Sequence, residues 1–544
     1  MRHYVGVTIG PIFDTISNAT IPAALWFASY LFSDLSRRIC EGVAGNPEKG
    51  VPKIPGAVIV SPYHDGAAEN DGVGKYHDRV IFHTEEFDDK SALDEEVRRV
   101  IRTAVTHTGD AFPGEAIAPN TREEFQTFLE QYLQIHHVIL SEKEVGEENC
   151  IMVLSPYLDA LELMKTFPMD SKIDPFRRMF ARKDVLQDSG NTLIKKSELF
   201  PSDAGNFLTG RDWRIRSISE IARAAKDSEW KHDYYYAVVS ADGDGMGKFL
   251  LGLQNDWVGF FSKGCLAYDK KAAELVSDYG GMPIYAGGDD LLFLAPLTGT
   301  GGITPDGQPL GGKSIVSLCA ALRDLFARTI RTEFEKAFRE KYENEPLPEL
   351  SFPTLSFGVA VQFEKFPLYE ALERARKLLE MAKTGEKDNI LLELRKHSGQ
   401  SAALLIHNPD AEAFEELSGA ARGDAVDGEK PTALLYTLEH FHAVVSQMVA
   451  NTRARLEAGE APDTLKEEFV LTWGNLFNNP GQKISDEYTK AVGGAYFTRL
   501  LSENRRVTVP GYAVPGEFQD NSLRSLVNIL IWEKFMREKA EDET

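Results

Sequence analysis

Cysteine is scarce in this chain of 544 residues. Its four cysteines stand far apart and form no CxxC pair, so neither a zinc knuckle nor a disulfide framework can be read from their spacing. Widely scattered thiols of this kind are expected to stay reduced, as they do in the cytosol. The four positions are Cys40, Cys150, Cys265 and Cys319.

Positive charge is also in short supply. The chain has 60 lysines and arginines against 83 aspartates and glutamates, which gives a net charge of −23. Non-specific binding to nucleic acid needs a cationic surface that neutralises phosphates, so this chain is expected to be a poor non-specific binder, with local basic patches still possible. The hydrophobic fraction of 43% and the charged fraction of 26% are ordinary for a globular protein.

Long hydrophobic runs are missing as well. The most apolar stretch near the N-terminus, "IPAALWFASYLF" at 21–32, is followed at once by Asp34, Arg37 and Arg38. A membrane-spanning helix needs about 20 apolar residues, and no basic leader with a small-residue cleavage site precedes the stretch. We therefore expect a buried helix here, no membrane association and a cytoplasmic protein.

The pattern of strands and helices repeats. "YVGVTIGPIF" (4–13) alternates as a strand does, and a helix, two strands and another helix follow it up to residue 105. The same order returns between 234 and 395. This predicts an α+β chain with two ferredoxin-like domains. We place the first at 1–120, a mostly helical connector at 121–212, the second at 213–400 and a helical C-terminal domain at 401–544.

Two adjacent aspartates interrupt a predicted hairpin in the second domain. "IYAGGDDLLFL" (284–294) places Asp289 and Asp290 between two apolar strands, and the strand "YYYAVVSAD" ends in Asp242. If these strands are neighbours, three carboxylates converge at one sheet edge, which is unfavourable unless a cation compensates them. Hard oxygen ligands suit Mg²⁺ or Mn²⁺, and such sites usually also hold substrate phosphates. This predicts a metal site of Asp242, Asp289 and Asp290 and a nucleotidyl-transfer chemistry.

A glycine-rich turn supports that interpretation. "DGDGMGK" (242–248) lies between a strand and a helix start, where backbone N–H groups can cradle a triphosphate. Its spacing is neither that of a P-loop nor that of a dinucleotide-binding fold. Alone it also fits a calcium loop or a plain turn. Together with "GGDD" about 45 residues later it favours a nucleotide site.

These motifs resemble a known family. "AVVSADGDGMGK", "IYAGGDDLLFL", "TLSFGVAV" and "AKTGEKDN" occur in the order found in the polymerase/cyclase palm of GGDD-type proteins. The N-terminal "VGVTIGPIFDTISNATIPAALWFASYLFSDL" resembles the first palm of the large subunit of type III CRISPR complexes, especially the Cmr kind. The resemblance covers residues 5–35 and 215–395, and both ferredoxin-like domains would then be palms, the first one non-catalytic.

The resemblance implies a function and roles for single residues. The family makes cyclic oligoadenylates or other adenylate signals from ATP when target RNA is bound, in a complex with other subunits and a guide RNA. Asp242 and Asp289 would bind the metal, and Asp290 would complete the site or orient the attacking 3′-hydroxyl. The remaining members of the site would bind the nucleotide: Gly243, Asp244 and Gly245 as the phosphate loop, with Gly288, Lys383 and Lys387. Lys248 is expected to be a plain surface lysine.

The sequence departs from the family pattern in two places. The first palm begins at residue 4, so we expect no HD nuclease domain and no DNase activity. Three His-Asp pairs at 64–65, 77–78 and 232–233 are interpreted as ordinary surface residues. The zinc-binding cysteines that the family carries between its palms are missing from the connector at 182–201, so no zinc is expected there.

Other functions remain open at this stage. A stand-alone nucleotide cyclase would need a symmetric partner palm, and two palms in one chain argue against it. A purely structural subunit that holds guide RNA and partner subunits is disfavoured by the intact aspartates. The Gly-rich insertion at 298–313 either closes over the site or forms a disordered hairpin extension.

Overall fold

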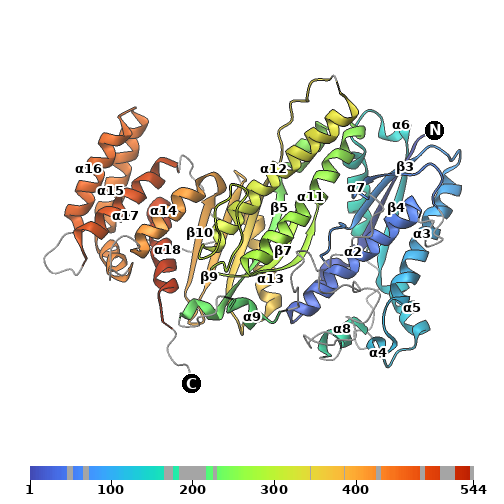
Figure 1. Ribbon diagram of the computed structural model, residues 1–544, viewed down its shortest axis with the longest axis horizontal. Helices are drawn as coiled ribbons and strands as arrows, with labels where there is room; N and C mark the ends of the chain where they lie inside the picture. Colours follow the sequence, from blue (N-terminus) through green and yellow to red (C-terminus); the bar gives the residue numbers. More distant parts are fainter. Residues whose placement is uncertain are drawn as a thin grey trace.

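The computed structural model describes most of the chain and places two β-sheets side by side, with a cluster of helices beyond the second (Figure 1). The first sheet lies near the N-terminus and the helical cluster holds the C-terminal part. The described residues are 1–45, 53–64, 73–164, 175–182, 185, 216–224, 230–343, 345–384, 386–423, 431–477, 484–502 and 521–539.

The first sheet has the predicted ferredoxin-like topology. Its strand order is β2-β3-β1-β4, and every neighbouring pair is antiparallel. The bounds are β1 His3–Gly10, β2 Val58–Ser61, β3 Arg79–Thr84 and β4 Gln134–Ser141. Helix α2 (Pro22–Ala44) joins β1 to β2, and α3 (Lys90–Asp110) follows β3. This is the first palm.

The second sheet repeats that topology and extends it. Its order is β10-β9-β8-β5-β7-β6, in which β8-β5-β7-β6 matches the first sheet strand for strand. The bounds are β5 Tyr235–Asp244, β6 Met282–Gly287, β7 Asp290–Pro296, β8 Thr354–Phe363, β9 Asn389–Arg395 and β10 Ser401–His407. The prediction of two similar ferredoxin-like domains is therefore confirmed.

Helices cover both sheets. In the second palm, α11 and α12 pack against each other, while α13 lies against β5, β8 and β9. The helices of this palm are α9 Ile218–Ala222, α10 Met246–Leu251, α11 Asn255–Tyr279, α12 Ile315–Lys341 and α13 Leu368–Ala382. The shorter helices of the N-terminal part are α1 Ile12–Ser17, α4 Gly114–Ile117, α5 Arg122–Tyr132, α6 Glu142–Val145, α7 Cys150–Glu162 and α8 Pro175–Ala181.

The two palms contact each other through equivalent elements. Helix α2 of the first palm packs on β6 of the second, and α11 of the second packs on β2 of the first. Each contact joins the helix after the first strand of one palm to the second strand of the other. The palms thus face each other in a reciprocal, nearly two-fold arrangement, as predicted.

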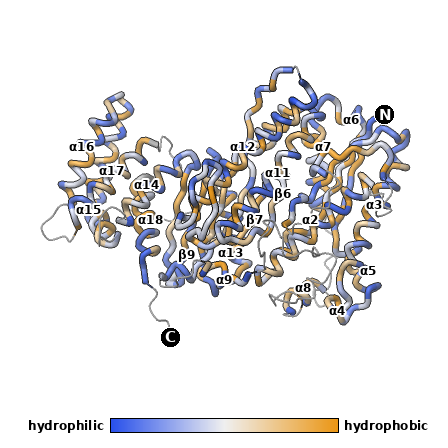
Figure 2. The backbone as a smooth tube through the Cα atoms, viewed as in Figure 1, coloured by the Kyte–Doolittle hydropathy of each residue, from blue (hydrophilic) through white to orange (hydrophobic). Residues whose placement is uncertain are grey.

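The apolar core follows from the composition of these elements. In Figure 2 the hydrophobic colour is dense around the first sheet and recurs in short stretches along the helices. Helix α2, predicted as a buried helix, is enclosed along almost its whole length, and Trp26 is completely buried. All four cysteines are buried as free thiols. Among the described residues, no helix is both long and apolar enough to cross a bilayer.

The C-terminal part is mainly helical. After a short 3-10 turn, η4 (Asn408–Asp410), it consists of α14 Ala411–Arg422, α15 Pro431–Glu457, α16 Pro462–Phe477, α17 Asp486–Ser502 and α18 Asn521–Met536. Helix α18 packs on β10, so these helices are attached to the edge of the second sheet.

Two sequence-based expectations need correction, and one open alternative can be decided. Residues 134–141 lie in the predicted helical connector but form β4, which pairs with β1 along its whole length. Strand β10 lies within the predicted helical C-terminal domain and pairs with β9. The insertion at 298–313 follows the end of β7 that lies away from Asp289, and it is held by the Tyr279 hydroxyl, which donates to the carbonyls of Leu297 and Lys313. Of the two alternatives left open for this insertion, closure over the aspartates is therefore wrong.

Candidate functional site

Asp289 lies at the tip of the hairpin between β6 and β7, next to the end of β5. Gly287 pairs with Asp290 across a two-residue turn, and Gly288 in that turn has a φ of 78°, which glycine adopts without strain. Strand β7 also pairs with β5, in a register that sets Ala241 opposite Leu291. The predicted adjacency of the two aspartate-bearing strands is confirmed.

Gly243 allows the two strands to close on each other. A Cβ added at this position would lie 2.5 Å from Asp289 Oδ2 and 2.8 Å from Asp289 Cβ, which no side chain can occupy. The glycine after Asp242 is therefore required by the close approach of Asp289, in addition to any role in a phosphate loop. Asp289 is also near enough to Asp242 for the Asp242 carboxylate to raise its pKa.

Crowded carboxylates change the acidity of the site. Burial and, after it, the Asp242 carboxylate raise the pKa of Asp289 to about 6. Burial and the charges of Asp289, Asp242 and Asp78 raise the pKa of Asp290 well above its usual value. Because Asp290 is exposed, the charges of the neighbouring carboxylates contribute more to this rise in pKa than burial does. The protein thus holds negative charge here that calls for a cation.

The donor set fits a hard divalent cation with few protein ligands. Among the described residues, no group of three or more His, Cys, Asp or Glu side chains is gathered closely enough to form a metal site by itself. The Asp242–Asp289 pair is nevertheless the kind of two-carboxylate anchor that Mg²⁺ uses when substrate phosphates and water complete its shell. The predicted ligand set of Asp242, Asp289 and Asp290 therefore remains a prediction, with the first two as its centre.

Lys383 reaches this pair from α13. It is the residue that ends the helix, and its ammonium group donates to the Asp242 carboxylate and to the Gly243 carbonyl, the latter at 2.8 Å. The prediction that Lys383 belongs to the site agrees with this position. Lys387 lies nearby in the following loop and is exposed, and Lys248 is an exposed lysine on α10, as expected.

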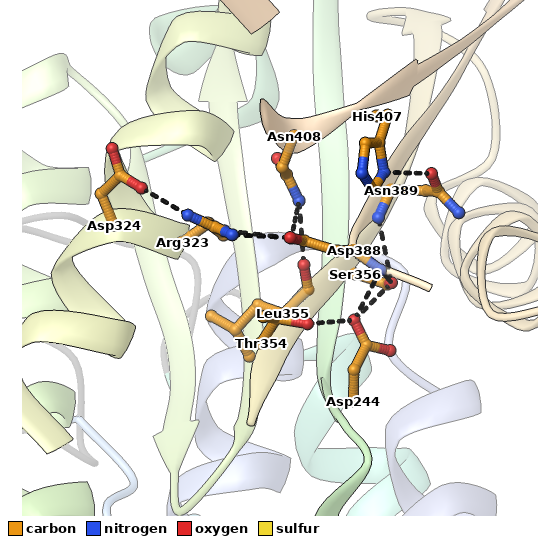
Figure 3. Close-up of polar contacts among 10 residues, drawn as sticks. All are labelled: Asp244, Arg323, Asp324, Thr354, Leu355, Ser356, Asp388, Asn389, His407 and Asn408. Atoms are coloured by element: carbon orange, nitrogen blue, oxygen red, sulfur yellow. Dashed lines mark hydrogen bonds and ion pairs between the residues drawn. The ribbon is translucent and has the colours of Figure 1, made fainter. Parts of the chain in front are cut away.

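The side chain of Asp244 is bonded within the domain, so the predicted phosphate loop, which stays a prediction, would use only the backbone of this residue. Asp244 is only 4% exposed, and its Oδ2 accepts hydrogen bonds from Thr354 (3.1 Å), Ser356 (2.8 Å) and the backbone N–H of Asp388 (2.9 Å) (Figure 3). The reason is that β5 continues through Asp244, which pairs with Thr354 of β8. Gly245 is exposed and begins α10 in a left-handed conformation, with open space around it.

A buried aspartate that the sequence analysis missed supports the turn. Asp269 on α11 is 1% exposed, and its Oδ2 accepts the backbone N–H of Gly288 at 3.2 Å. The predicted nucleotide contact of Gly288 therefore cannot use this N–H, which is already bonded. "AYDKKAAEL" reads as an ordinary amphipathic helix, so the only available signal was one acidic residue at a position where the pattern expects an apolar one.

The first palm also contributes to the surroundings of the turn. The Gly74 carbonyl accepts the backbone N–H of Ala286 at 2.9 Å, and Gly74 forms a parallel bridge with Tyr285. His77 Cδ2 lies 3.7 Å from the position of a Cβ at Gly288. The segment at 73–78 thus packs against the hairpin that carries Asp289.

The pair His77–Asp78 is consequently not an ordinary surface pair, and that interpretation is corrected. Ser61 Oγ and His77 Nε2 are hydrogen-bonded at 2.9 Å, and Ser36 donates to the His77 carbonyl. Burial, assisted by the charge of Arg79, lowers the pKa of His77 to about 4. Of the other two pairs, His64–Asp65 cannot be described, because Asp65 lies outside the described residues. In the pair His232–Asp233, burial lowers the pKa of His232 to about 4.

Most of the connector at 182–201, where no zinc is expected, also lies outside the described residues.

Comparison with known proteins identifies the domain that carries this site. Residues 235–391 match the family model of the second palm domain of Cas10/Cmr2. In this domain the chain is Cas10-like. The resemblance to the large palm subunit of type III CRISPR complexes is thereby confirmed. The region outside 235–391 does not take part in this match.

One curated relative and several solved structures resemble parts of the chain. The chain is 28% identical over 214 residues to the CRISPR system Cmr subunit Cmr2 of Pyrococcus furiosus, a match that covers 34% of this chain and 21% of the relative. The chain thus matches about a fifth of that relative's length. Among solved structures, a chain of the Csm1–Csm4 cassette in complex with cA4 is 12% identical, with a TM-score of 0.46. The match covers 93% of this chain and 70% of that chain. The apo cassette is 13% identical with a TM-score of 0.45, covering 92% and 70%.

Proposed function

We propose that the chain is a metal-dependent nucleotidyltransferase that makes cyclic or linear oligoadenylates from ATP within a type III CRISPR complex. The observation that carries the proposal is the position of Asp242 and Asp289 at adjacent strand ends, in a domain that matches the Cas10/Cmr2 second palm. The other subunits, the guide RNA and a target RNA that triggers synthesis are part of the same proposal, which extends to the cytoplasmic setting of such complexes.

The reaction is a displacement at phosphorus. The 3′-hydroxyl oxygen of one ATP attacks the α-phosphorus of another, a new O–P bond forms, the bond to the β-phosphate oxygen breaks and pyrophosphate leaves with both electrons. The hydroxyl proton passes to a carboxylate or to water. A bound Mg²⁺ or Mn²⁺ would supply activation of the hydroxyl and charge stabilisation on the leaving group.

The residues of this chain have distinct tasks in that step. Asp242 and Asp289 would hold the cation, and Asp290 would add negative charge beside it or orient the hydroxyl. Lys383 neutralises charge on the departing pyrophosphate, and the exposed Lys387 and Gly245 contact phosphate from the rim of the site. No covalent protein intermediate is required, so positioning and electrostatics supply most of the acceleration.

The facing first palm supports this function over a stand-alone cyclase. A single palm needs a second one to present the acceptor nucleotide, and here the reciprocal contacts of α2 with β6 and of α11 with β2 provide it within one chain. The segment at 73–78 of the first palm lies against the Asp289 hairpin, next to the proposed reaction.

The test is product analysis. The assembled complex is incubated with ATP, Mg²⁺ and target RNA, and the products are separated and identified by mass spectrometry. We expect adenylate oligomers and pyrophosphate that depend on both the cation and the RNA. A complex that binds guide and target RNA but forms no product from ATP would instead support a purely structural subunit. Product formed by the isolated chain without RNA would support a stand-alone cyclase.

A further inference from the structure

Asp388 has an unusual backbone conformation, and its N–H, carbonyl and carboxylate are all hydrogen-bonded. Its φ of 68° is the only positive φ of a non-glycine residue within the described part of the chain, a conformation that costs energy unless the surroundings enforce it. Its N–H donates to Asp244 (2.9 Å) and to Ser356 (3.1 Å), and its carbonyl accepts the N–H of Asn408 (2.9 Å). Its carboxylate accepts two bonds from Arg323 (3.0 and 2.6 Å) and one from Asn408 Nδ2 (3.0 Å) (Figure 3).

These partners come from separate parts of the fold. Asp244 ends β5, two residues beyond Asp242, and Arg323 belongs to α12. Asn408 begins η4, where the chain leaves the second sheet for the C-terminal helices, and its Nδ2 also donates to the Leu355 carbonyl at 3.0 Å. Asp388 is therefore a junction between the catalytic strand, the outer helix layer and the attachment point of the C-terminal part.

Asp388 fixes the end of the loop that carries Lys383 and Lys387. The loop begins at Lys383 and ends at Asp388. The next residue, Asn389, is hydrogen-bonded both to the residue before the loop and to a residue within it. Asn389 Nδ2 donates to the carbonyls of Ala382 (2.9 Å) and Glu386 (2.5 Å). Because both ends of the loop are held by hydrogen bonds, the position of Lys383 relative to Asp242 is restricted. An unfixed loop would have to be ordered at each binding event, at a cost in free energy for every residue.

We propose that Asp388 is a positioning residue for the site, locked by Arg323 and Asn408 so that Lys383 is held beside Asp242. Through Asn408 the same lock ties the lysine loop to the start of the C-terminal helices. Asp388 and Arg323 act through Lys383 and do not touch the substrate. This inference rests on the proposed function for its phosphate-binding consequence, but the lock itself can be tested without it.

The first measurement is amide hydrogen exchange in peptides that span 383–389, in the complete chain. Arg323→Met removes the two bonds to the Asp388 carboxylate. Arg328→Met is the matched control, because Arg328 lies on the same helix but pairs with the exposed Asp306. We expect exchange in 383–389 to accelerate about tenfold in Arg323→Met and to stay unchanged in Arg328→Met, with similar unfolding midpoints for both. Unchanged exchange in folded Arg323→Met overturns the proposal.

The second measurement is ATP affinity in a double-mutant cycle. Arg323→Met should weaken ATP binding about tenfold in the wild-type background and have no further effect in Lys383→Met, because it acts through that lysine. An equal loss in both backgrounds contradicts a positioning role. If Arg323→Met does not fold, Asp388→Asn replaces it, since asparagine tolerates the left-handed backbone but loses the ion pair. A wild-type complex that does not bind ATP would refute the proposed function, while the exchange result would still decide whether the lock exists.

Discussion

The ammonium group of Lys383 pairs with the carboxylate of Asp242, 141 residues earlier in the chain. The partners are both partly exposed, with side-chain exposures of 21% and 35%, so the pair is accessible to a ligand. Lys383 also lowers the pKa of Asp289, against the stronger upward effects of burial and of Asp242. The lysine is thus the cation that offsets part of the negative charge of the site.

Replacing Lys383 should impair synthesis more than it impairs the fold. For Lys383→Met we expect the rate of adenylate synthesis at saturating ATP to fall by about 100-fold, a loss typical of a group that stabilises charge in the transition state. Initial rates at several ATP concentrations give this value. Lys248→Met removes an exposed lysine from the neighbouring α10 and should change neither kcat nor KM. Equal rates for the two variants would show that Lys383 has no part in the reaction.

Gly243 provides a steric test of the Asp289 contact. In Gly243→Ala the new methyl group would meet Asp289, so the strands must separate or the aspartate must turn away. We expect a destabilisation of about 1–3 kcal/mol, as for other overpacked positions, and loss of synthesis. Thermal unfolding and product yield are measured together. The control is Gly247→Ala, where the nearest atom is Met152 Cε at an ordinary 3.8 Å, and both quantities should stay near wild type.

Much of the site could be predicted because its signals are local. Strand, glycine and aspartate follow one another in "SADGDG" and "AGGDD", so adjacency of Asp242 and Asp289 needed only the ferredoxin-like strand order. The role of Asp244 could not be predicted, because its partner Ser356 is 112 residues away and the motif alone resembles a phosphate loop. Strand β4 was missed because "QIHHVILS" directly follows a helical stretch and carries two histidines.

Asp269 should affect the rate of synthesis by holding the turn that carries Asp289, because its carboxylate accepts the Gly288 N–H. Asp269→Leu removes the acceptor and leaves a partly buried N–H without this partner, which costs about 1 kcal/mol. We expect synthesis to fall at least tenfold. Asp269→Asn retains a carbonyl oxygen of the same shape and should recover most of the rate. Lys271→Gln, an exposed position on the same helix, is the control. If Asp269→Asn and Asp269→Leu lose activity equally, the carboxylate has some role other than supporting the turn.

His77 predicts a pH dependence of stability. Its folded pKa of about 4 lies below the ordinary value for histidine, about 6.5. The unfolded chain therefore takes up a proton first as the pH falls, and the stability that neutral His77 contributes above pH 6.5 is lost towards pH 4. Because the residue keeps partial exposure, we expect a contribution of about 1 kcal/mol, less than the full shift implies.

Unfolding by urea at pH 7.5 and pH 5, in wild type and in His77→Gln, measures this contribution. The difference in unfolding free energy between the two pH values should be smaller in His77→Gln than in wild type. His107→Gln, which alters an exposed histidine of α3, should behave as wild type does. A His77→Gln chain with an undiminished difference would show that His77 is not the neutral, shielded group inferred here.

The central claim is that ATP reacts at the paired aspartates, and the double change Asp289→Ala with Asp290→Ala tests it most directly. The assembled complex is supplied with α-labelled ATP, Mg²⁺ and target RNA, and labelled oligoadenylate is quantified beside the amount of RNA bound. We predict that synthesis falls below detection while assembly, RNA binding and thermal stability are retained, since removing the crowded carboxylates relieves repulsion. Labelled product at the wild-type rate from this variant would contradict the account.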